Sequence, residues 1–286
     1  MISDITLGQF FPGNSVIHRL DPRTKIIMAT FFIASLFVAN TPLGFAVMAI
    51  TTVFLVLATK ISIKVVIKSV KPIVFILIFT SLLNIFMTVG DSAPLFEFYF
   101  IKVYREGIIR AVFMSVRVIL LILGSTMLLT YTTSPIILTD GIESLLSPLK
   151  RIKLPVHEFA MMMSIALRFI PTLVEETEKI MNAQKSRGAD FSSGGIVKRA
   201  KALIPILVPL FVSSFKRADE LATAMECRCY RGDVKRTKLV KLEYKARDVI
   251  AMLLLLALLA LIICSRVIPP LFESDAAWYK VVFYKF

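Results

Sequence analysis

The chain has 286 residues, of which 57% are hydrophobic, and its mean hydropathy is +0.77. Soluble domains are usually about 45–50% apolar, so the composition excludes an ordinary soluble domain and indicates a membrane protein. The net charge of +14, from 34 Lys and Arg against 20 Asp and Glu, is explained first by the orientation of membrane loops. A nucleic-acid partner would depend on that charge alone, and we expect none.

The N-terminal residues do not have the pattern of a cleavable signal peptide. Met1–Leu20 mixes charged and polar residues with apolar ones, and it contains no apolar stretch that ends in small residues. We therefore expect the first membrane span to direct insertion as well. Asp21-Pro22 predicts where that helix begins, with an N-cap residue followed by proline at the first helical position.

Five apolar runs predict membrane-spanning helices, so the fold class is all-α and polytopic. A span needs roughly 17–25 residues, and fewer where flanking basic side chains reach the interface. The five runs are Thr24–Ala39, Pro42–Thr59, Pro72–Val89, Gly107–Thr133 and Val249–Ser265. The first run is short and depends on Arg23 and Lys25 to complete the span.

The placement of basic residues predicts the orientation in the cell membrane. Cytoplasmic loops carry the excess of Lys and Arg. The connection Asn40–Thr41 has none, and in Gly90–Glu106 the basic residues are balanced by acidic ones. The second connection carries four lysines, Lys60, Lys64, Lys68 and Lys71. We therefore predict a cytoplasmic N-terminus, a cytoplasmic stretch Ser134–Arg247, and an external C-terminus.

Three parts of the chain follow from these spans. Residues 1–133 form a membrane region with four spans, 134–247 a cytoplasmic module, and 248–286 the last span with a short external tail. Two apolar runs inside the module, Phe159–Leu167 and Leu203–Phe215, are too short to span, and the second contains two prolines. Counting them as spans would also place six Lys and Arg outside, against the charge rule.

Each of these two runs extends into a long amphipathic helix when it is examined at helical spacing. On the first helix, apolar side chains from Phe159 to Met181 share one face. On the second, the shared face consists of Leu207, Leu210, Phe211, Phe215, Ala218, Leu221, Ala222 and Met225. Both helices begin more apolar than they end. One end can therefore lie against a membrane or a membrane protein while the other reaches into water.

Both amphipathic helices end in an arginine among small residues. The two ends are Ser186-Arg187-Gly188 and Cys227-Arg228-Cys229, the second being followed by Arg231 and Gly232. Arginine in a last turn with glycine beyond it is also ordinary C-capping. The arrangement occurs twice, however, and an exposed guanidinium on a rigid helix end suits bidentate bonding to a partner's carboxylates or carbonyls. Two such ends indicate a partner with two similar halves.

Over nearly its whole length, the chain resembles the T component of energy-coupling factor (ECF) transporters, their transmembrane coupling subunit. The motifs that carry the resemblance are Leu20–Lys25, Thr132–Pro135, Pro148–Arg151, Leu154-Pro155, Ala166–Pro171 and the two arginine ends. The resemblance implies that Arg187 and Arg228 belong to Ala-Arg-Gly-type motifs on coupling helices, which dock into two ABC-type ATPase subunits. Arg168, Pro171, Arg231 and Gly232 are candidate supporting residues.

This sequence departs from the family's pattern beside the two arginines. Ser186 replaces alanine in the first motif, and Cys227 and Cys229 replace alanine and glycine in the second. All three replacements are small, so we expect close packing against a partner to survive. Without glycine at position 229, Gly232 becomes the expected stop of the second helix.

The resemblance implies a subunit without catalytic residues, which transmits ATP-driven motion to a small substrate-binding membrane protein for uptake of a vitamin or a transition-metal ion. The sequence agrees, since Gly195-Ile196 stands where a phosphate-binding loop needs Lys-Ser or Lys-Thr. We therefore expect no cofactor on this chain, and ATP and Mg on the partner ATPases. Cys227 and Cys229 lie far in sequence from His18 and His157, so we predict no metal site.

Arg117 is the charge that lies deepest in a predicted span, ten residues into the fourth run and about 15 Å deep. Such a charge is a candidate functional group, and bonding to the backbone carbonyls of neighbouring spans explains it equally well. The alternative function is a self-sufficient permease or channel that needs no ATPase. It predicts polar residues along several spans, and no Asp or Glu occurs between Pro22 and Gly90.

Overall fold

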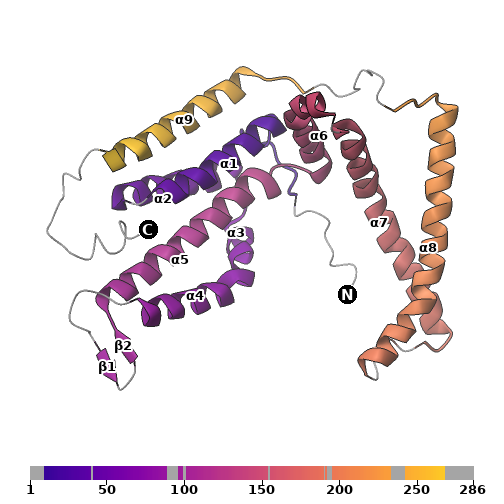
Figure 1. Cartoon of the computed structure of the whole chain (residues 1–286), viewed down its shortest axis with the longest axis horizontal. Coiled ribbons are helices and arrows are strands. Elements are labelled where there is room, and N and C mark those ends of the chain that lie inside the picture. The colour runs from indigo at the N-terminus through magenta and orange to yellow at the C-terminus, as the bar shows by residue number, and fades with distance from the viewer. Residues whose placement is uncertain are drawn as a thin grey trace. The chain divides into compact units, whose positions relative to one another are not determined.

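The computed structural model describes residues 10–39, 41–88, 96–98, 101–153, 155–189, 191, 195–232 and 242–267. The chain divides into two compact units (Figure 1). We call residues 10–134 together with 242–267 the bundle unit, and residues 135–232 the arm unit. Among the described residues, the chain leaves the bundle unit after Ser134 and is in that unit again from Leu242.

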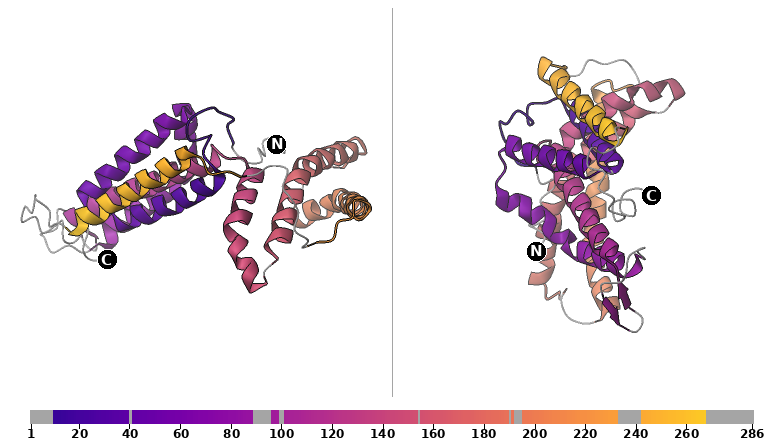
Figure 2. Two further views of the ribbon diagram at one scale, coloured as in Figure 1. Left: turned by 90° about the horizontal axis from the view of Figure 1, so that it is seen from above. Right: turned by 90° about the vertical axis from the view of Figure 1, so that its left-hand side faces the viewer.

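The bundle unit consists almost entirely of helices that run side by side (Figure 2). Its elements are α1 (Pro22–Val38), α2 (Pro42–Thr59), α3 (Ile63–Val70), η1 (Lys71–Ile73), α4 (Val74–Met87), β1 (Phe96–Phe98), β2 (Ile101–Val103), α5 (Arg105–Ser125), η2 (Thr126–Thr130) and α9 (Ala246–Val267). The two short strands pair antiparallel, with Phe96 opposite Val103. The prediction of an all-α polytopic fold is confirmed, and this small hairpin within the third connection is its one addition among the described residues.

The first two helices begin where side-chain caps and prolines start them. Asp21 is the N-cap of α1 and accepts a hydrogen bond from the backbone nitrogen of Arg23 at 2.9 Å, as Asp21-Pro22 predicted. Thr41 caps α2 in the same way, through a bond of 3.1 Å from the backbone nitrogen of Gly44. Each cap satisfies one of the backbone N–H groups that the first turn of a helix leaves without a partner.

Four helical segments among the described residues are long and apolar enough to cross a membrane. They are Pro42–Thr59, Ile63–Met87, Arg105–Thr130 and Ala246–Cys264. The segment predicted to begin at Pro72 begins at Ile63, because α3 and η1 continue into α4. Lys64 and Lys68, which were predicted to lie in the connection before it, are therefore part of α3. α1 has 17 residues, about 26 Å at 1.5 Å per residue, so it is short for a hydrocarbon core of about 30 Å. The fifth span stays a prediction.

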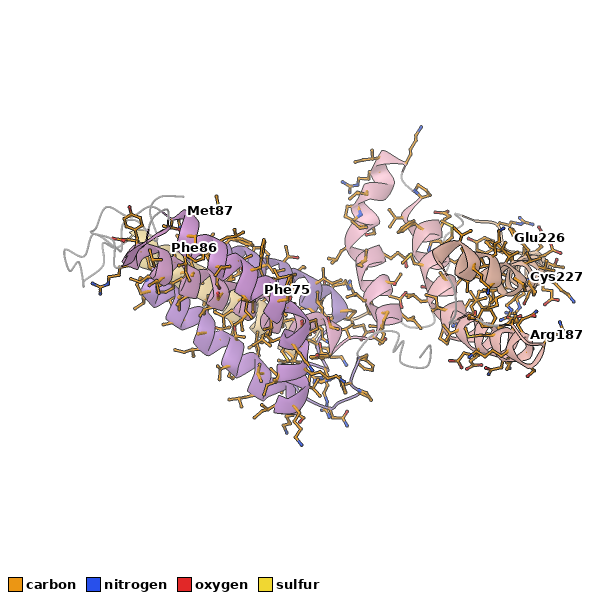
Figure 3. The ribbon with its side chains drawn as sticks, turned by 90° about the horizontal axis from the view of Figure 1, so that it is seen from below. Phe75, Phe86, Met87, Arg187, Glu226 and Cys227 are labelled. Atoms are coloured by element: carbon orange, nitrogen blue, oxygen red, sulfur yellow. The ribbon has the colours of Figure 1, made fainter. Side chains whose placement is uncertain are left out.

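α1 lies at the centre of the bundle unit although it is the shortest of the five predicted spans. It packs against α5 and α9 and contributes the buried side chains Ala29, Phe32 and Leu36 to the main apolar cluster. The outer surface of the unit is also apolar, and α4 exposes Phe75, Phe86 and Met87 (Figure 3). A bundle that is apolar inside and outside suits a lipid environment, where the exposed face contacts acyl chains.

We expect Gly124→Leu to destabilise the bundle unit. A Cβ at position 124 of α5 would clash with the Phe32 ring, which is 1% exposed and has no room to withdraw. Overpacking of this kind costs about 3 kcal/mol, more than the roughly 1 kcal/mol that helix propensity returns. The measurement is the midpoint of thermal unfolding of the detergent-purified chain. Val112→Leu is the control, since Val112 is exposed on the same helix; equal midpoints would contradict the prediction.

The arm unit is built on two long helices that contact each other. Its elements are α6 (Pro135–Leu146), η3 (Ser147–Ile152), α7 (Val156–Ser186) and α8 (Ile196–Cys227). α7 has 31 residues and α8 has 32 residues, so each is about 47 Å long at 1.5 Å per residue. α6 is joined to α7 where Nδ1 of His157 lies 3.0 Å from Oε1 of Glu143. The two predicted amphipathic helices are therefore present as continuous elements.

Candidate functional site

One acidic side chain joins α7 to α8 where the two helices pack together. The Glu176 carboxylate on α7 accepts hydrogen bonds from the Ser213 hydroxyl and, at 2.8 Å, from Nη2 of Arg217, both on α8. These side chains are partly buried, so the ion pair is screened less than a fully exposed one. We call Glu176, Ser213 and Arg217 the crossing contact.

The ion pair of the crossing contact, Glu176 with Arg217, lies at the same distance from both arginine ends. Arg187 follows Glu176 by 11 residues on α7, and Arg228 follows Arg217 by 11 residues on α8. At 1.5 Å per residue, each arginine lies about 16 Å along its helix from the contact. The contact therefore joins equivalent positions of two similar helices, and the duplication seen in the sequence extends to the place where they meet.

The first arginine end closes α7 with a Schellman motif. Arg187 is the C-cap residue, with φ −87° and ψ 7°, and Gly188 follows in the left-handed conformation with φ +85°. The backbone nitrogen of Gly188 donates to the Lys185 carbonyl at 2.9 Å, and that of Ala189 donates to the Gln184 carbonyl at 3.0 Å. These two bonds satisfy carbonyls that the last turn leaves open and fix the backbone that carries the arginine.

The second arginine end has the same backbone geometry. Arg228 is the C-cap residue of α8, with φ −88° and ψ 15°, and Cys229 follows with φ +56°. The backbone nitrogen of Cys229 donates to the Glu226 carbonyl at 2.8 Å, and that of Tyr230 donates to the Met225 carbonyl at 3.0 Å. The two arginines are therefore presented by helix ends with the same type of capping motif, although the residues beside them differ.

The expectation that Gly232 stops the second helix is wrong, because α8 ends at Cys227. A left-handed backbone at a residue other than glycine costs roughly 1–2 kcal/mol. The Schellman hydrogen bonds at Cys229 offset this cost, so a cysteine occupies the position that glycine usually takes. Gly232 is also left-handed, with φ +63°, and it belongs to the turn beyond the helix end.

Both guanidinium groups are available to a partner. Arg187 and Arg228 are exposed, and no side-chain hydrogen bond or ion pair joins either of them to another described residue. The hydroxyl of Ser186 bonds back to the Asn182 carbonyl at 3.1 Å, so it faces its own helix. Small neighbours leave the two arginines as the projecting groups at the ends of α7 and α8, where Figure 3 labels Arg187 and Cys227.

The candidate supporting residues divide into two groups. Arg231 is exposed and, like Gly232, lies within four residues of Arg228, at the same end of α8. Arg168 and Pro171 lie 19 and 16 residues before Arg187, which is about 24–28 Å along α7. The structure therefore does not bring Arg168 or Pro171 to the arginine end.

Arg117 has a partner in the bundle unit. Its Nη2 donates to the Ala39 carbonyl at 3.0 Å, and its guanidinium lies 5.0 Å from the centre of the Phe45 ring. Ala39 is the C-cap residue of α1, so Arg117 places positive charge at the negative end of that helix. This bonding matches the structural explanation that the sequence left open, a contact with a backbone carbonyl of a neighbouring span.

An exposed apolar row on α8 was missed as a separate feature at the sequence level. At helical spacing, Ile206, Leu210 and Leu221 lie on the face of α8 that carries Ser213 and Arg217, and they are at least partly covered. The neighbouring row stays exposed, and we call it the α8 strip: Leu203, Leu207, Phe211 and Phe215. The Phe215 side chain is 73% exposed. An apolar row of this kind points to contact with a membrane or another protein.

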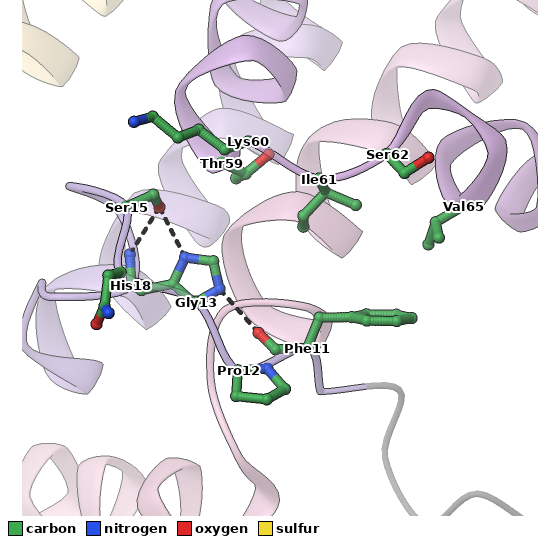
Figure 4. A pocket seen from close by; sticks show the side chains of 11 residues that line it. Phe11, Pro12, Gly13, Ser15, His18, Thr59, Lys60, Ile61, Ser62 and Val65 are labelled. Atoms are coloured by element: carbon green, nitrogen blue, oxygen red, sulfur yellow. Dashed lines mark hydrogen bonds between the residues drawn. The ribbon is translucent and has the colours of Figure 1, made fainter.

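A pocket of about 370 Å³ lies in the bundle unit beside His18 and Lys60 (Figure 4). Both ring nitrogens of His18 have partners, since Nδ1 lies 2.7 Å from the Ser15 hydroxyl and Nε2 lies 3.0 Å from the Phe11 carbonyl. His18 therefore holds the segment before α1.

No three His, Cys, Asp or Glu side chains come together as a metal site within the described part of the chain.

Comparison with known proteins identifies the family. The pattern of the CbiQ family, described as cobalt transport protein, matches residues 13–239. The chain belongs to the CbiQ family. Its relatives in that family include a protein of Clostridium kluyveri that is 54% identical over 93% of this chain and 98% of its own length. A Bacillus subtilis protein is 49% identical over 93% of this chain and its own full length.

Both relatives are named energy-coupling factor transporter transmembrane protein EcfT. An Acidaminococcus fermentans protein with the same name is 53% identical over 93% of this chain and 98% of its own length. The resemblance drawn from the sequence motifs is therefore confirmed. The match to the CbiQ family covers α1 through α8, so it includes both arginine ends.

Proposed function

We propose that this chain is the transmembrane coupling subunit of an ECF-type importer, working with two ABC-type ATPase subunits and a small substrate-binding membrane protein. Membership of the CbiQ family and relatives of about 50% identity support the energy-coupling role. The observation that carries the proposal is the pair of exposed arginines on matching helix ends, equally far from one crossing contact. Two equal ends suit two similar ATPase subunits.

The mechanism is the transfer of motion along rigid helices. Each guanidinium would bond to carboxylates or carbonyls in a groove of one ATPase, where a planar group with five donors gives a directional contact. When ATP draws the ATPases together and hydrolysis releases them, the ends of α7 and α8 would follow. The crossing contact at Glu176 joins the two helices, so movement at the ends would change how α7 and α8 lie at their apolar parts.

The apolar parts of the two helices would carry that movement to the substrate-binding membrane protein. The α8 strip and the exposed Phe159 and Met162 of α7 offer an apolar surface for such a partner. The substrate would be a vitamin or a transition-metal ion, bound by the partner. ATP and Mg would be bound by the ATPases, and this chain would contribute no catalytic residue.

The orientation proposed for the chain places the arm unit in the cytoplasm of the cell. Residues 134–247 hold 20 Lys and Arg against 12 Asp and Glu, which fits the cytoplasmic side. ATP and the ATPase subunits lie on that side. The N-terminus would also be cytoplasmic and the C-terminus external, as the loop charges predict.

Purification from native membranes tests the proposal. We expect a tagged chain, extracted in mild detergent, to co-purify with two related ATPases and a small membrane protein. Arg187→Glu combined with Arg228→Glu should remove the ATPases, because both guanidinium contacts become repulsive to carboxylates. The control, Lys179→Glu with Lys216→Glu, changes the same charge on exposed residues of the same helices. A chain that purifies alone and passes solute in vesicles would instead be a self-sufficient permease.

A further inference from the structure

A cluster of charged and polar groups lies in the bundle unit at the beginning of α1, and we call it the root cluster: Asp21, Arg23, Lys25, Thr132, Thr133 and Asp248. The Lys25 side chain is 2% exposed. Its Nζ donates to the carbonyls of Thr132 at 2.9 Å and His18 at 3.2 Å, and to the Thr133 hydroxyl at 3.1 Å. Lys25 therefore fixes the chain just beyond η2 to the first turn of α1.

The two aspartates of the root cluster connect α1 to α9. Oδ1 of Asp248 accepts from the backbone nitrogen of Asp21 at 2.8 Å, and its Oδ2 accepts from the backbone nitrogen of Lys245 at 2.9 Å. Asp248 is 3% exposed, and together with Asp21 it attracts the Lys25 ammonium group. One buried carboxylate thus caps the beginning of α9 and holds the N-cap residue of α1.

Arg23 holds the chain that leads into α9. Its Nη2 donates to the Leu242 carbonyl at 2.6 Å, and its Nε lies 3.2 Å from Oδ1 of Asp21. The guanidinium also lies 4.4 Å from the centre of the Tyr244 ring. A planar guanidinium that is bonded on two sides and stacked on a ring has little freedom to turn.

The root cluster therefore holds the chain where it leaves the bundle unit after Ser134 and where it is in that unit again at Leu242. Thr133 stands two residues before Pro135, where the arm unit begins, and Leu242 is the first residue after the chain returns. Lys25 holds the first of these places and Arg23 the second, from positions two residues apart on α1. Buried charges of this kind are stable only when their partners stay in place, so the cluster resists displacement of the chain at either place.

We propose that the root cluster is the fixed base of the coupling helices, with Lys25 and Arg23 as positioning residues. This inference depends on the proposed coupling function. A load applied at Arg187 and Arg228 is transmitted only if the arm unit is anchored where it joins the bundle. Without the cluster, the chain near Ser134 and Leu242 moves when α7 and α8 move, so the bundle unit does not follow. ATP is then hydrolysed without transport.

The test uses the whole transporter in vesicles and compares substrate taken up per ATP hydrolysed. The variants are Lys25→Met, Arg23→Met and Thr133→Val. Each removes the side-chain hydrogen bonds that one residue makes in the root cluster, and Thr133→Val keeps the shape of the side chain. Lys64→Met is the control, since it removes an exposed lysine of the same unit. We expect the ratio to fall about tenfold or more in Lys25→Met, the effect of losing hydrogen bonds to a charged group, and to stay at the wild-type value in Lys64→Met.

Co-purification of the ATPases and the small membrane protein shows in each variant that the complex has assembled. A fall in uptake per ATP within an assembled complex supports the root cluster as the base. If Lys25→Met does not assemble, Arg23→Met and Thr133→Val decide, with a smaller fall expected. Assembled variants that couple as well as the wild type overturn the proposal. A wild-type complex that hydrolyses no ATP and moves no substrate overturns the coupling function itself.

Discussion

Reversing the charge at either arginine end is expected to stop uptake while the chain stays folded and inserted in the membrane. Arg187 and Arg228 are exposed and bond to no described side chain, so Arg187→Glu or Arg228→Glu should change stability by less than about 0.5 kcal/mol. Losing a hydrogen-bonded charge pair in an interface costs about 2–5 kcal/mol. The loss corresponds to at least about 30-fold in affinity for one ATPase.

The measurement is substrate uptake by vesicles that contain the reconstituted complex, together with ATP hydrolysis. We expect each single variant to lose uptake, since one free ATPase breaks the paired movement, and the double variant to lose the ATPases as well. Lys179→Glu and Lys216→Glu should leave uptake at the wild-type level. Normal uptake in the double variant would show that these arginines have no part in coupling.

The native cysteines give a second measurement of the same contact. Cys227 and Cys229 flank Arg228 and are exposed. Alkylation of Cys227 and Cys229 by a maleimide should be slowed when the ATPases are bound, because docking covers the end of α8. The same chain labelled without the ATPases is the reference. Equal labelling of Cys227 and Cys229 with and without bound ATPases would mean that docking occurs elsewhere.

Features set by neighbouring residues could be predicted from the sequence. The beginning of α1 follows from Asp21-Pro22, and the apolar runs follow from hydropathy. The arginine ends follow from two amphipathic patterns of similar length. In each case the determinant lies within one continuous stretch of the chain, so local propensity and periodicity decide it. The end of α8 is the exception, because hydrogen bonds around Cys229 override the preference for glycine.

Features that depend on distant residues could not be predicted. Asp21 bonds to Asp248, 227 positions away, and nothing near either residue in the sequence indicates the other. The partner of Arg117 is a carbonyl 78 positions away. On α8, the apolar residues form one broad face at helical spacing, and only packing decides that Leu210 is partly covered while Phe211 stays exposed. Periodicity predicts that a face of a helix is apolar, but it does not predict which helix or partner covers that face.

Replacing the aromatic pair of the α8 strip is expected to separate the two kinds of partner. Phe211 and Phe215 are 60% and 73% exposed, and their rings stack with centres 6.4 Å apart. Burying one such side chain contributes about 1.5–3 kcal/mol, and a charge in its place would leave an unpaired group in the contact. Phe211→Arg with Phe215→Arg should therefore lose the small membrane protein, whereas the ATPases stay bound at the arginine ends.

Co-purification of the tagged variant measures this separation directly. The crossing contact joins α8 to α7 through Ser213 and Arg217, so the double substitution on the exposed row leaves those bonds intact. Ile152→Arg is the control, since Ile152 is 74% exposed on η3 of the same unit. If the small membrane protein stays bound to the Phe211→Arg, Phe215→Arg variant, the α8 strip is not its docking surface. We expect the Phe211→Arg, Phe215→Arg variant to lose only the small membrane protein and the Arg187→Glu, Arg228→Glu variant to lose the ATPases. These two results together would assign the small membrane protein to the α8 strip and an ATPase to the arginine end of the same helix.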